Sequence, residues 1–135
     1  MKQQNVFAVV LAVVVIVGAS FFLGGMFFNS GTGNSVIPNS INPNPKTVTV
    51  EITNSGFSPS SVTIKSGDTV KFVNMDSSRH WPASNPHPFH TDYPGFDALQ
   101  GLDQGESYSF TFTRIGNWHY HDHLNPATGG SVSVS

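Results

Sequence analysis

Histidines are the residues of this chain best suited to chemistry. There are six of them, in two groups: His80, His87 and His90, then His119, His121 and His123. Imidazole is the commonest transition-metal ligand in proteins. The chain has no cysteine, so a metal held here would have nitrogen and oxygen ligands without a thiolate. Two groups well separated in sequence can meet at one end of a folded domain, which predicts a metal-binding protein.

The stretch His121-Asp122-His123 has the spacing of two ligands on one strand. Alternate residues of a strand point to the same face roughly 6.5–7 Å apart, so two imidazoles can converge on one ion. Further ligands are expected from His87 and His90. Copper (Cu2+) is the expected ion, because Cu(II) accepts tetragonal nitrogen and oxygen donors and leads the divalent affinity series. Zinc would take the same donors in a tetrahedron, and iron is a further alternative.

The N-terminal part of the chain is apolar and almost uncharged. Except for Lys2, every charged residue lies at Lys46 or later, and residues 6–28 are all apolar or small. That run exceeds the roughly 20 residues needed to cross a bilayer, so it predicts one transmembrane helix. A signal peptide cleaved near Ala19 is the alternative. Lys2 favours an inside N-terminus, which predicts a single-pass protein of the cell membrane with its C-terminal domain on the extracytoplasmic side.

The remaining chain divides into a linker and a β domain. Residues 29–45 consist mostly of Asn, Ser, Gly and Pro and are expected to be a disordered linker. From 46 to 135, strands are expected at 47–52, 62–64, 70–74, 107–113, 117–121 and 130–135. Short strands separated by turn residues predict an all-β sandwich.

The segment 75–105 is too long for an ordinary turn, and such segments are usually functional or disordered. Four aromatic residues are expected to pack this segment onto the sandwich: Trp81, Phe89, Tyr93 and Phe96. Asp92 and Asp97 are interpreted as loop acids unless they orient a metal ligand.

Several motifs in this part of the chain resemble those of a cupredoxin. They are Gly56-Phe57-Ser58-Pro59, Gly67-Asp68, Asn74-Met75-Asp76 followed by His80, and, near the end, Gly116, Trp118, Tyr120 and Gly129-Gly130. The resemblance covers residues 46–135 and implies a Greek-key β-sandwich of the cupredoxin-like kind. It also implies that His80 is a metal ligand.

The metal loop departs from the family pattern. A blue-copper cupredoxin resembling this chain would carry Cys, His and Met where Asp122, Asn125 and Thr128 stand, and of its ligands His80 alone is kept. The chain therefore resembles the cysteine-free, histidine-rich cupredoxin-like domains of membrane-anchored prokaryotic proteins. That resemblance implies copper or a similar metal, without the thiolate on which blue-copper redox tuning depends.

Strand alternation gives the two sides of the 117–121 strand different roles. If Trp118 and Tyr120 face the core, Asp122 faces inward as well. The three histidines of this stretch then face outward, and the first of them, His119, is expected to be exposed surface.

Two arrangements of the metal site remain open. In one, the strand ends early and His123 turns back toward Asp122 and His80. In the other, the outward histidines of the strand meet His87 and His90 on the outer face. The two can also exist as adjacent sites.

The expected function is metal binding, for copper storage, copper delivery or slow electron transfer with an unidentified partner protein. No nucleophile-and-base arrangement is present, so an enzyme is not expected. One alternative is a structural or interaction module with a zinc or pH-sensitive histidine cluster, and another is periplasmic iron handling. Charged residues make up 10% of the chain and the net charge is −2, so nucleic acid is not an expected partner.

Overall fold

The computed structural model describes residues 41–135, which form eight β-strands and no helix. The anchor predicted at 6–28 and the linker residues 29–40 lie outside the described residues. Within the described part of the chain, no helix is long and apolar enough to cross a membrane. The predicted all-β sandwich is confirmed.

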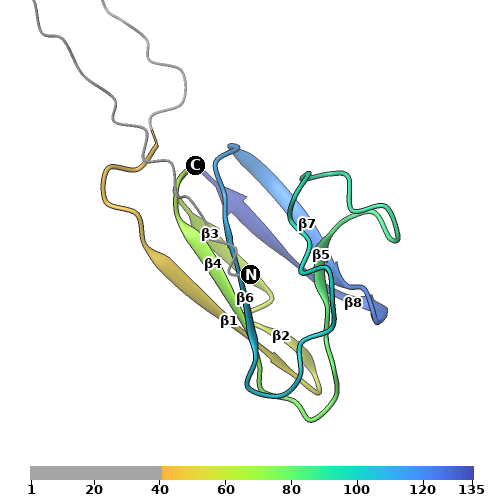
Figure 1. The fold of residues 1–135 in the computed structure, drawn as a ribbon. Helices are drawn as coiled ribbons and strands as arrows, with labels where there is room; N and C mark the ends of the chain where they lie inside the picture. The colour runs from red at the N-terminus through yellow and green to blue at the C-terminus, as the bar shows by residue number, and fades with distance from the viewer. Residues whose placement is uncertain (1–40) are drawn as a thin grey trace, which may run out of the picture. The chain divides into compact units, whose positions relative to one another are not determined.

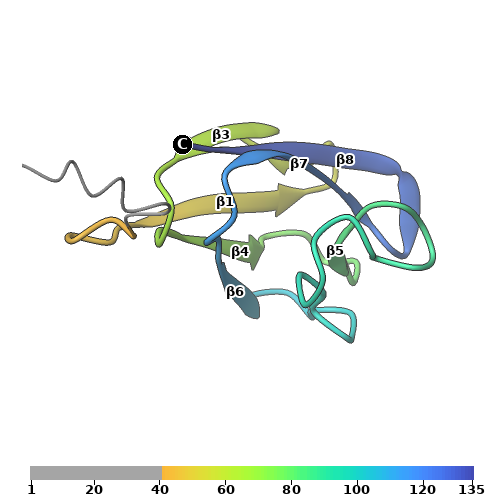
Figure 2. The same cartoon turned by 90° about the horizontal axis from the view of Figure 1, so that it is seen from above.

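The strands form two four-stranded sheets packed face to face, which are seen as two layers in Figures 1 and 2. The first sheet has the order β2 (Gly56–Ser58), β1 (Thr47–Thr53), β4 (Thr69–Asn74) and β6 (Ser107–Thr111). The second has the order β3 (Ser61–Ile64), β8 (Asn125–Val134), β7 (Gly116–Asp122) and β5 (Pro82–Ser84). The pairs β1–β4 and β3–β8 are parallel, and the other pairs are antiparallel.

The core lies between the sheets and is built by strand alternation. Val50, Val70, Phe72, Tyr120 and Val132 come from four strands and are all fully buried. Alternate side chains of a strand point to one face, so the period-2 pattern of these strands places an apolar face of each sheet in the core. This packing holds β7 in place between β8 and β5.

The segment 75–105 is ordered against the sandwich and contains the short strand β5. Ser84 N donates to Phe96 O at 2.8 Å, and Ala98 N donates to Pro82 O at 3.1 Å. The segment therefore returns along the free edge of β5. Tyr93 and Phe96 are buried in the core, as predicted.

Phe89 departs from the prediction, because its side chain is 73% exposed. The residue lies in a tight turn in which the backbone N–H groups of Phe89 and His90 both donate to Pro86 O at 2.9 Å. This turn directs Phe89 toward solvent and places His90 next to β7.

The folded part also includes residues 41–45, which their composition assigned to the linker. Asn42 N donates to Ser66 O at 2.7 Å, and Asn42 Nδ2 donates to Asp68 Oδ1 at 2.8 Å. The backbone N–H of Lys46 donates to the same carboxylate oxygen at 2.9 Å. Backbone and polar side-chain hydrogen bonds therefore attach this stretch to the domain.

Candidate metal centre

The centre is built on the outer face of β7. Tyr120 and Asp122 are buried on the inner side, and His119 is exposed on the outer side, as predicted. The residues paired with His121 are Ala83 on β5 and Gly129 on β8. Cross-strand partners share a face, so these small neighbours leave room above the sheet for imidazole rings.

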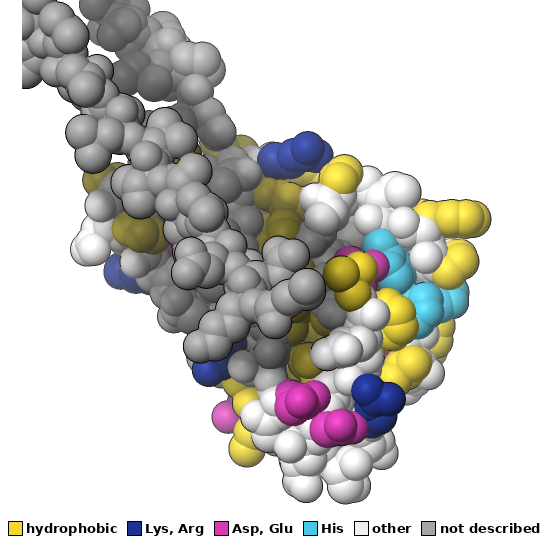
Figure 3. All heavy atoms as spheres, viewed as in Figure 1, with side chains coloured by type: hydrophobic (Ala, Val, Ile, Leu, Met, Phe, Trp, Pro, Cys, Tyr) yellow, Lys and Arg dark blue, Asp and Glu magenta, His cyan; other side chains and the backbone are white. Residues whose placement is uncertain are grey.

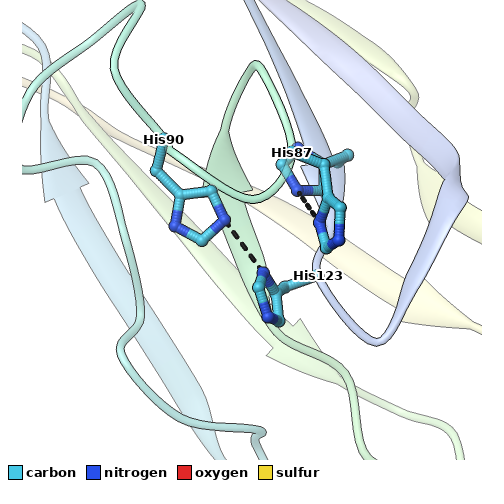
Figure 4. Close-up of side chains that lie close together, drawn as sticks. His87, His90 and His123 are labelled. Atoms are coloured by element: carbon cyan, nitrogen blue, oxygen red, sulfur yellow. Dashed lines mark hydrogen bonds between the residues drawn. The ribbon is translucent and has the colours of Figure 1, made fainter.

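Four histidines meet in this space: His87, His90, His121 and His123. Each offers one ring nitrogen, and these nitrogens lie within 4.8 Å of one another. His87 Nδ1 lies 3.2 Å from His121 Nε2, and His90 Nε2 lies 2.9 Å from His123 Nδ1. Figure 3 shows histidine side chains gathered on the face in view and bordered by apolar ones, and Figure 4 shows His87, His90 and His123 converging. We call this group the four-histidine cluster.

Three different parts of the fold supply these rings. His121 comes from β7, and His123 lies in the two-residue turn between β7 and β8, where its backbone N–H donates to Trp81 O at 2.7 Å. His87 and His90 come from the segment after β5. The cluster therefore depends on the path by which that segment folds back over β7.

Hydrogen bonds on the far side of two rings fix their tautomers. His90 Nδ1 lies 2.6 Å from Asp97 Oδ2, and His121 Nδ1 lies 2.9 Å from Asn85 Oδ1. A carboxylate and an amide oxygen accept hydrogen bonds, so both Nδ1 atoms carry the proton. The Nε2 lone pairs of His90 and His121 then face into the cluster, as ligand orientation by outer hydrogen bonds requires.

Burial keeps two of the four imidazoles uncharged, those of His121 and His123. Desolvation, assisted by the neighbouring histidines, lowers the pKa of His121 to about 4. Desolvation and the proximity of His87 and His90 also lower the pKa of His123. At neutral pH these imidazoles are therefore in the neutral form that binds metal.

Trp81 covers one side of the cluster. Its ring lies 4.3 Å from the His123 ring, measured between centroids, and its Nε1 donates to Asp97 Oδ1 at 2.6 Å. Burial opposes ionisation of Asp97, but hydrogen bonds from Trp81, the Leu99 N–H and His90 outweigh it and lower the pKa of this carboxyl. Asp97 is therefore an anion that orients His90 and holds Trp81 in place.

His80 and Asp122 lie outside the four-histidine cluster and pair with each other. His80 Nδ1 lies 2.8 Å from Asp122 Oδ2, and His80 Nε2 lies 3.0 Å from Asp76 Oδ2. Carboxylates only accept, so the ring satisfies both contacts as an imidazolium. Burial disfavours that charge, but the hydrogen bonds to Asp122 and Asp76 prevail and raise the pKa of His80. Neither ring nitrogen of His80 is free for a metal.

Asp122, Asn125 and Thr128, which stand where the resemblance implies the metal loop, also make hydrogen bonds within the protein. Asn125 Nδ2 donates to Thr128 Oγ1 at 3.0 Å. Asp122 accepts two further hydrogen bonds at Oδ1, from the backbone N–H groups of Trp81 at 2.8 Å and Leu124 at 3.1 Å. The polar side chains at these three positions are thus engaged by other protein groups.

Of the two arrangements that the sequence left open, the structure shows the one on the outer face of β7. His87, His90, His121 and His123 come together, whereas His80 and Asp122 form a separate pair on the other face of β7. Asn85, the hydrogen-bond partner of His121, was not predicted from the sequence.

The donor set fits a transition-metal ion. Four nitrogens bound at about 2.0 Å in a tetrahedron lie about 3.3 Å apart, close to the two nitrogen pairs at 3.2 and 2.9 Å. The remaining nitrogens lie within 4.8 Å of one another, so the rings would move inward to bring them to the same spacing. A bound ion would also replace the ring-to-ring hydrogen bonds, with His87 and His123 transferring the Nδ1 proton to Nε2.

No family model and no curated protein matches this sequence. Solved structures do. A purple cupredoxin from Nitrosopumilus maritimus is similar at 25% identity with a TM-score of 0.57, over 64% of this chain and 98% of that one. A reduced mutant of amicyanin matches in fold, at 24% identity and a TM-score of 0.56, over 66% of this chain and 82% of that one.

A copper-containing nitrite reductase from Thermus scotoductus SA-01 is also similar, at 30% identity with a TM-score of 0.53. The match covers 75% of this chain and 24% of that one, so this chain corresponds to about a quarter of the reductase.

Proposed function

We propose that this chain, which contains a cupredoxin-like domain without the blue-copper cysteine, binds Cu(II) through the four-histidine cluster. The observation that carries the proposal is the convergence of four ring nitrogens within 4.8 Å, two of them oriented by outer hydrogen bonds. The ion would lie on the outer face of β7 and use the imidazoles of His87, His90, His121 and His123.

Copper is favoured over zinc by the donor set and the fold. Nitrogen donors bind Cu(II) more tightly than the other divalent first-row ions, and the similar nitrite reductase contains copper. A cluster of four nitrogens also suits tetrahedral zinc. Zinc is therefore the principal competitor, and direct competition between the two ions decides between them.

The chemistry of the site favours holding or delivering copper over rapid electron transfer. Without a thiolate, Cu(II) and Cu(I) prefer different geometries, so each change of oxidation state would require the rings to rearrange. A binding or delivery protein, and not an enzyme, is the role that these ligands support best. A partner that supplies or receives the ion is part of the proposal.

The proposed location rests on the sequence. The apolar run at residues 6–28 is long enough to anchor the chain in a membrane. Lys2 favours an extracytoplasmic domain. Carbonate extraction of membranes, with protease accessibility of the domain in intact cells, tests both parts of this proposal.

The copper proposal is tested on the full-length chain by titration with Cu(II) in competition with glycine, followed by EPR of the loaded protein. We expect nitrogen hyperfine structure from several imidazoles. His87→Gln or His123→Gln should weaken binding by more than about 100-fold.

His119→Gln is the matched control, because this exposed residue lies outside the cluster, and its affinity should equal that of the unaltered chain. Failure of the chain to compete with glycine would contradict the proposal. Zinc or iron bound in preference to copper would contradict the choice of metal.

A further inference from the structure

The two sides of the four-histidine cluster differ in how they are covered. On the side of His123, the ring of Trp81 lies 4.3 Å away and is held by its hydrogen bond to Asp97. On the other side, His87 and His121 line an open groove, and His90 and His123 do not. An ion would therefore reach the cluster from the side of His87 and His121.

This outer groove has a volume of about 580 Å³ and lies over the outer faces of β7, β8 and β3. Its lining includes small residues, namely Gly129, Ser131 and Ser61. The volume is within the range of small-molecule sites, roughly 300–1,000 Å³. The groove is therefore large enough for a ligand of amino-acid size beside the two histidines.

The four ligands also differ in how freely they can exchange. His121 is 3% exposed and bonded to Asn85, and His90 is bonded to Asp97. His87 is the exposed member of the cluster, and within residues 41–135 no hydrogen bond is made by its Nε2. His87 is thus the ligand that can swing out and return at the lowest cost.

A fifth imidazole, that of His119, lies in the outer groove next to the cluster. His119 is exposed, precedes His121 by two residues on the same face of β7, and lines the outer groove. Residues at this spacing lie roughly 6.5–7 Å apart, so one ion can pass from His119 to His121 in a single short step. The four-histidine cluster does not use His119.

The residues that line the groove favour a copper complex of a particular net charge. Its lining has hydroxyl, amide and imidazole groups but no carboxylate, lysine or arginine. A polar lining without acidic side chains, lysine or arginine suits an uncharged complex. Cu(II) bound by two amino-acid anions is such a complex, with nitrogen and oxygen donors that imidazoles can displace.

We propose that the outer groove is the loading site of the cluster, where Cu(II) arrives as a neutral bis(amino acid) complex and is first taken up by His119 and His87. Each imidazole nitrogen that binds the ion displaces one amine or carboxylate donor. The two released amino-acid anions each take up a proton from water, and copper stays Cu(II) throughout. This inference rests on the proposed copper function.

The test is stopped-flow loading of the full-length chain with Cu(II) bis-glycinate, read out by quenching of tryptophan fluorescence, with the equilibrium affinity measured separately. His119→Gln and Ser61→Tyr, which fills the groove, should each slow loading about tenfold or more while leaving the affinity unchanged. Thr63→Tyr is the matched control, since Thr63 is the next exposed position on the same strand and does not line the groove.

A second probe tests the charge argument. Loading of the unaltered chain from the anionic Cu(II) nitrilotriacetate complex should be slow and limited by release of the ion from the chelate, because the groove has no cationic side chain to hold this complex. The two groove variants should therefore change that rate little. Equal loading rates in all variants, an equal slowing for the two complexes, or a loss of affinity in His119→Gln would overturn the inference. Those outcomes leave the proposed function standing, whereas failure of the unaltered chain to bind Cu(II) would remove the function itself.

Discussion

Replacing Asp122 by asparagine tests the inner side of β7 directly. The Asp122 carboxylate is 1% exposed and accepts hydrogen bonds from His80 Nδ1 and from the backbone N–H groups of Trp81 and Leu124. An asparagine keeps a carbonyl oxygen for the two backbone donors. Its amide NH₂ then faces His80 Nδ1, so the charge-assisted hydrogen bond to the imidazolium is lost.

The expected loss follows from the type of bond. A hydrogen bond to a charged group contributes about 1.5–3 kcal/mol, so Asp122→Asn should lower the free energy of unfolding by about 2 kcal/mol. For a domain of this size that is a decrease in Tm of roughly 8–16 °C. The pKa of His80 is raised in the folded state, so this stabilisation is complete below its unfolded pKa of about 6.5 and disappears as the pH rises through the folded value.

The assay is thermal unfolding of the metal-free chain at pH 6 and pH 9, followed by circular dichroism in the presence of a chelator. The difference between Asp122→Asn and the unaltered chain should be large at pH 6 and smaller at pH 9. Asp103→Asn is the control, because its ion pair with Arg79 is exposed and should contribute less than about 1 kcal/mol. A variant as stable as the unaltered chain, or a difference equal at both pH values, would refute the imidazolium assignment.

Three further predictions concern the metal centre. Cu(II) should quench the fluorescence of Trp81, whose ring lies 4.3 Å from that of His123; Trp81→Phe should remove this quenching and Trp118→Phe should retain it. The metal-free chain should lose up to about 3 kcal/mol of stability as the pH falls from 6.5 to about 4, because the unfolded state binds a proton that buried His121 does not. Denaturant unfolding should show a flatter pH profile for His121→Asn, and an unchanged profile would contradict the burial argument. Asp97→Asn, which weakens the support of a ligand ring, should reduce Cu(II) affinity about 10- to 100-fold with the EPR nitrogen pattern retained; unaltered affinity would show that Asp97 has no orienting role.

The β-sandwich could be predicted because the pattern that indicates each strand lies within a few consecutive residues. Alternation along a few residues fixes which side chains of a strand face the core, as with Val50 and Ile52 of β1. The same rule placed Asp122 inward and His121 outward on β7. The short strand β5 gave no such signal, since Pro82, Ala83 and Ser84 are three buried residues without alternation.

The composition of the candidate metal centre was harder to predict because it depends on contacts between residues distant in sequence. Whether His87 and His90 reach β7 is decided by the return of the segment along β5, which is fixed by Tyr93 and Phe96 in the core. Asn85 becomes the partner of His121 only through that path. His80 was expected to bind metal from the family resemblance, but Asp76 and Asp122 engage both of its nitrogens.

The back-to-back placement of two polar centres on β7 has a consequence for the history of such domains. Asp122 and His80 lie on the inner side, at positions where the resemblance implies a family metal site, and the four-histidine cluster lies on the outer side of the same strand. Strand β7 thus separates the His80–Asp122 pair from the four-histidine cluster. If the four-histidine cluster binds copper as proposed, a lineage can acquire these outer ligands while the inner side of the strand still holds a metal, and lose the inner ligands afterwards. Such a relocation needs no change of fold and no ancestor without a metal site.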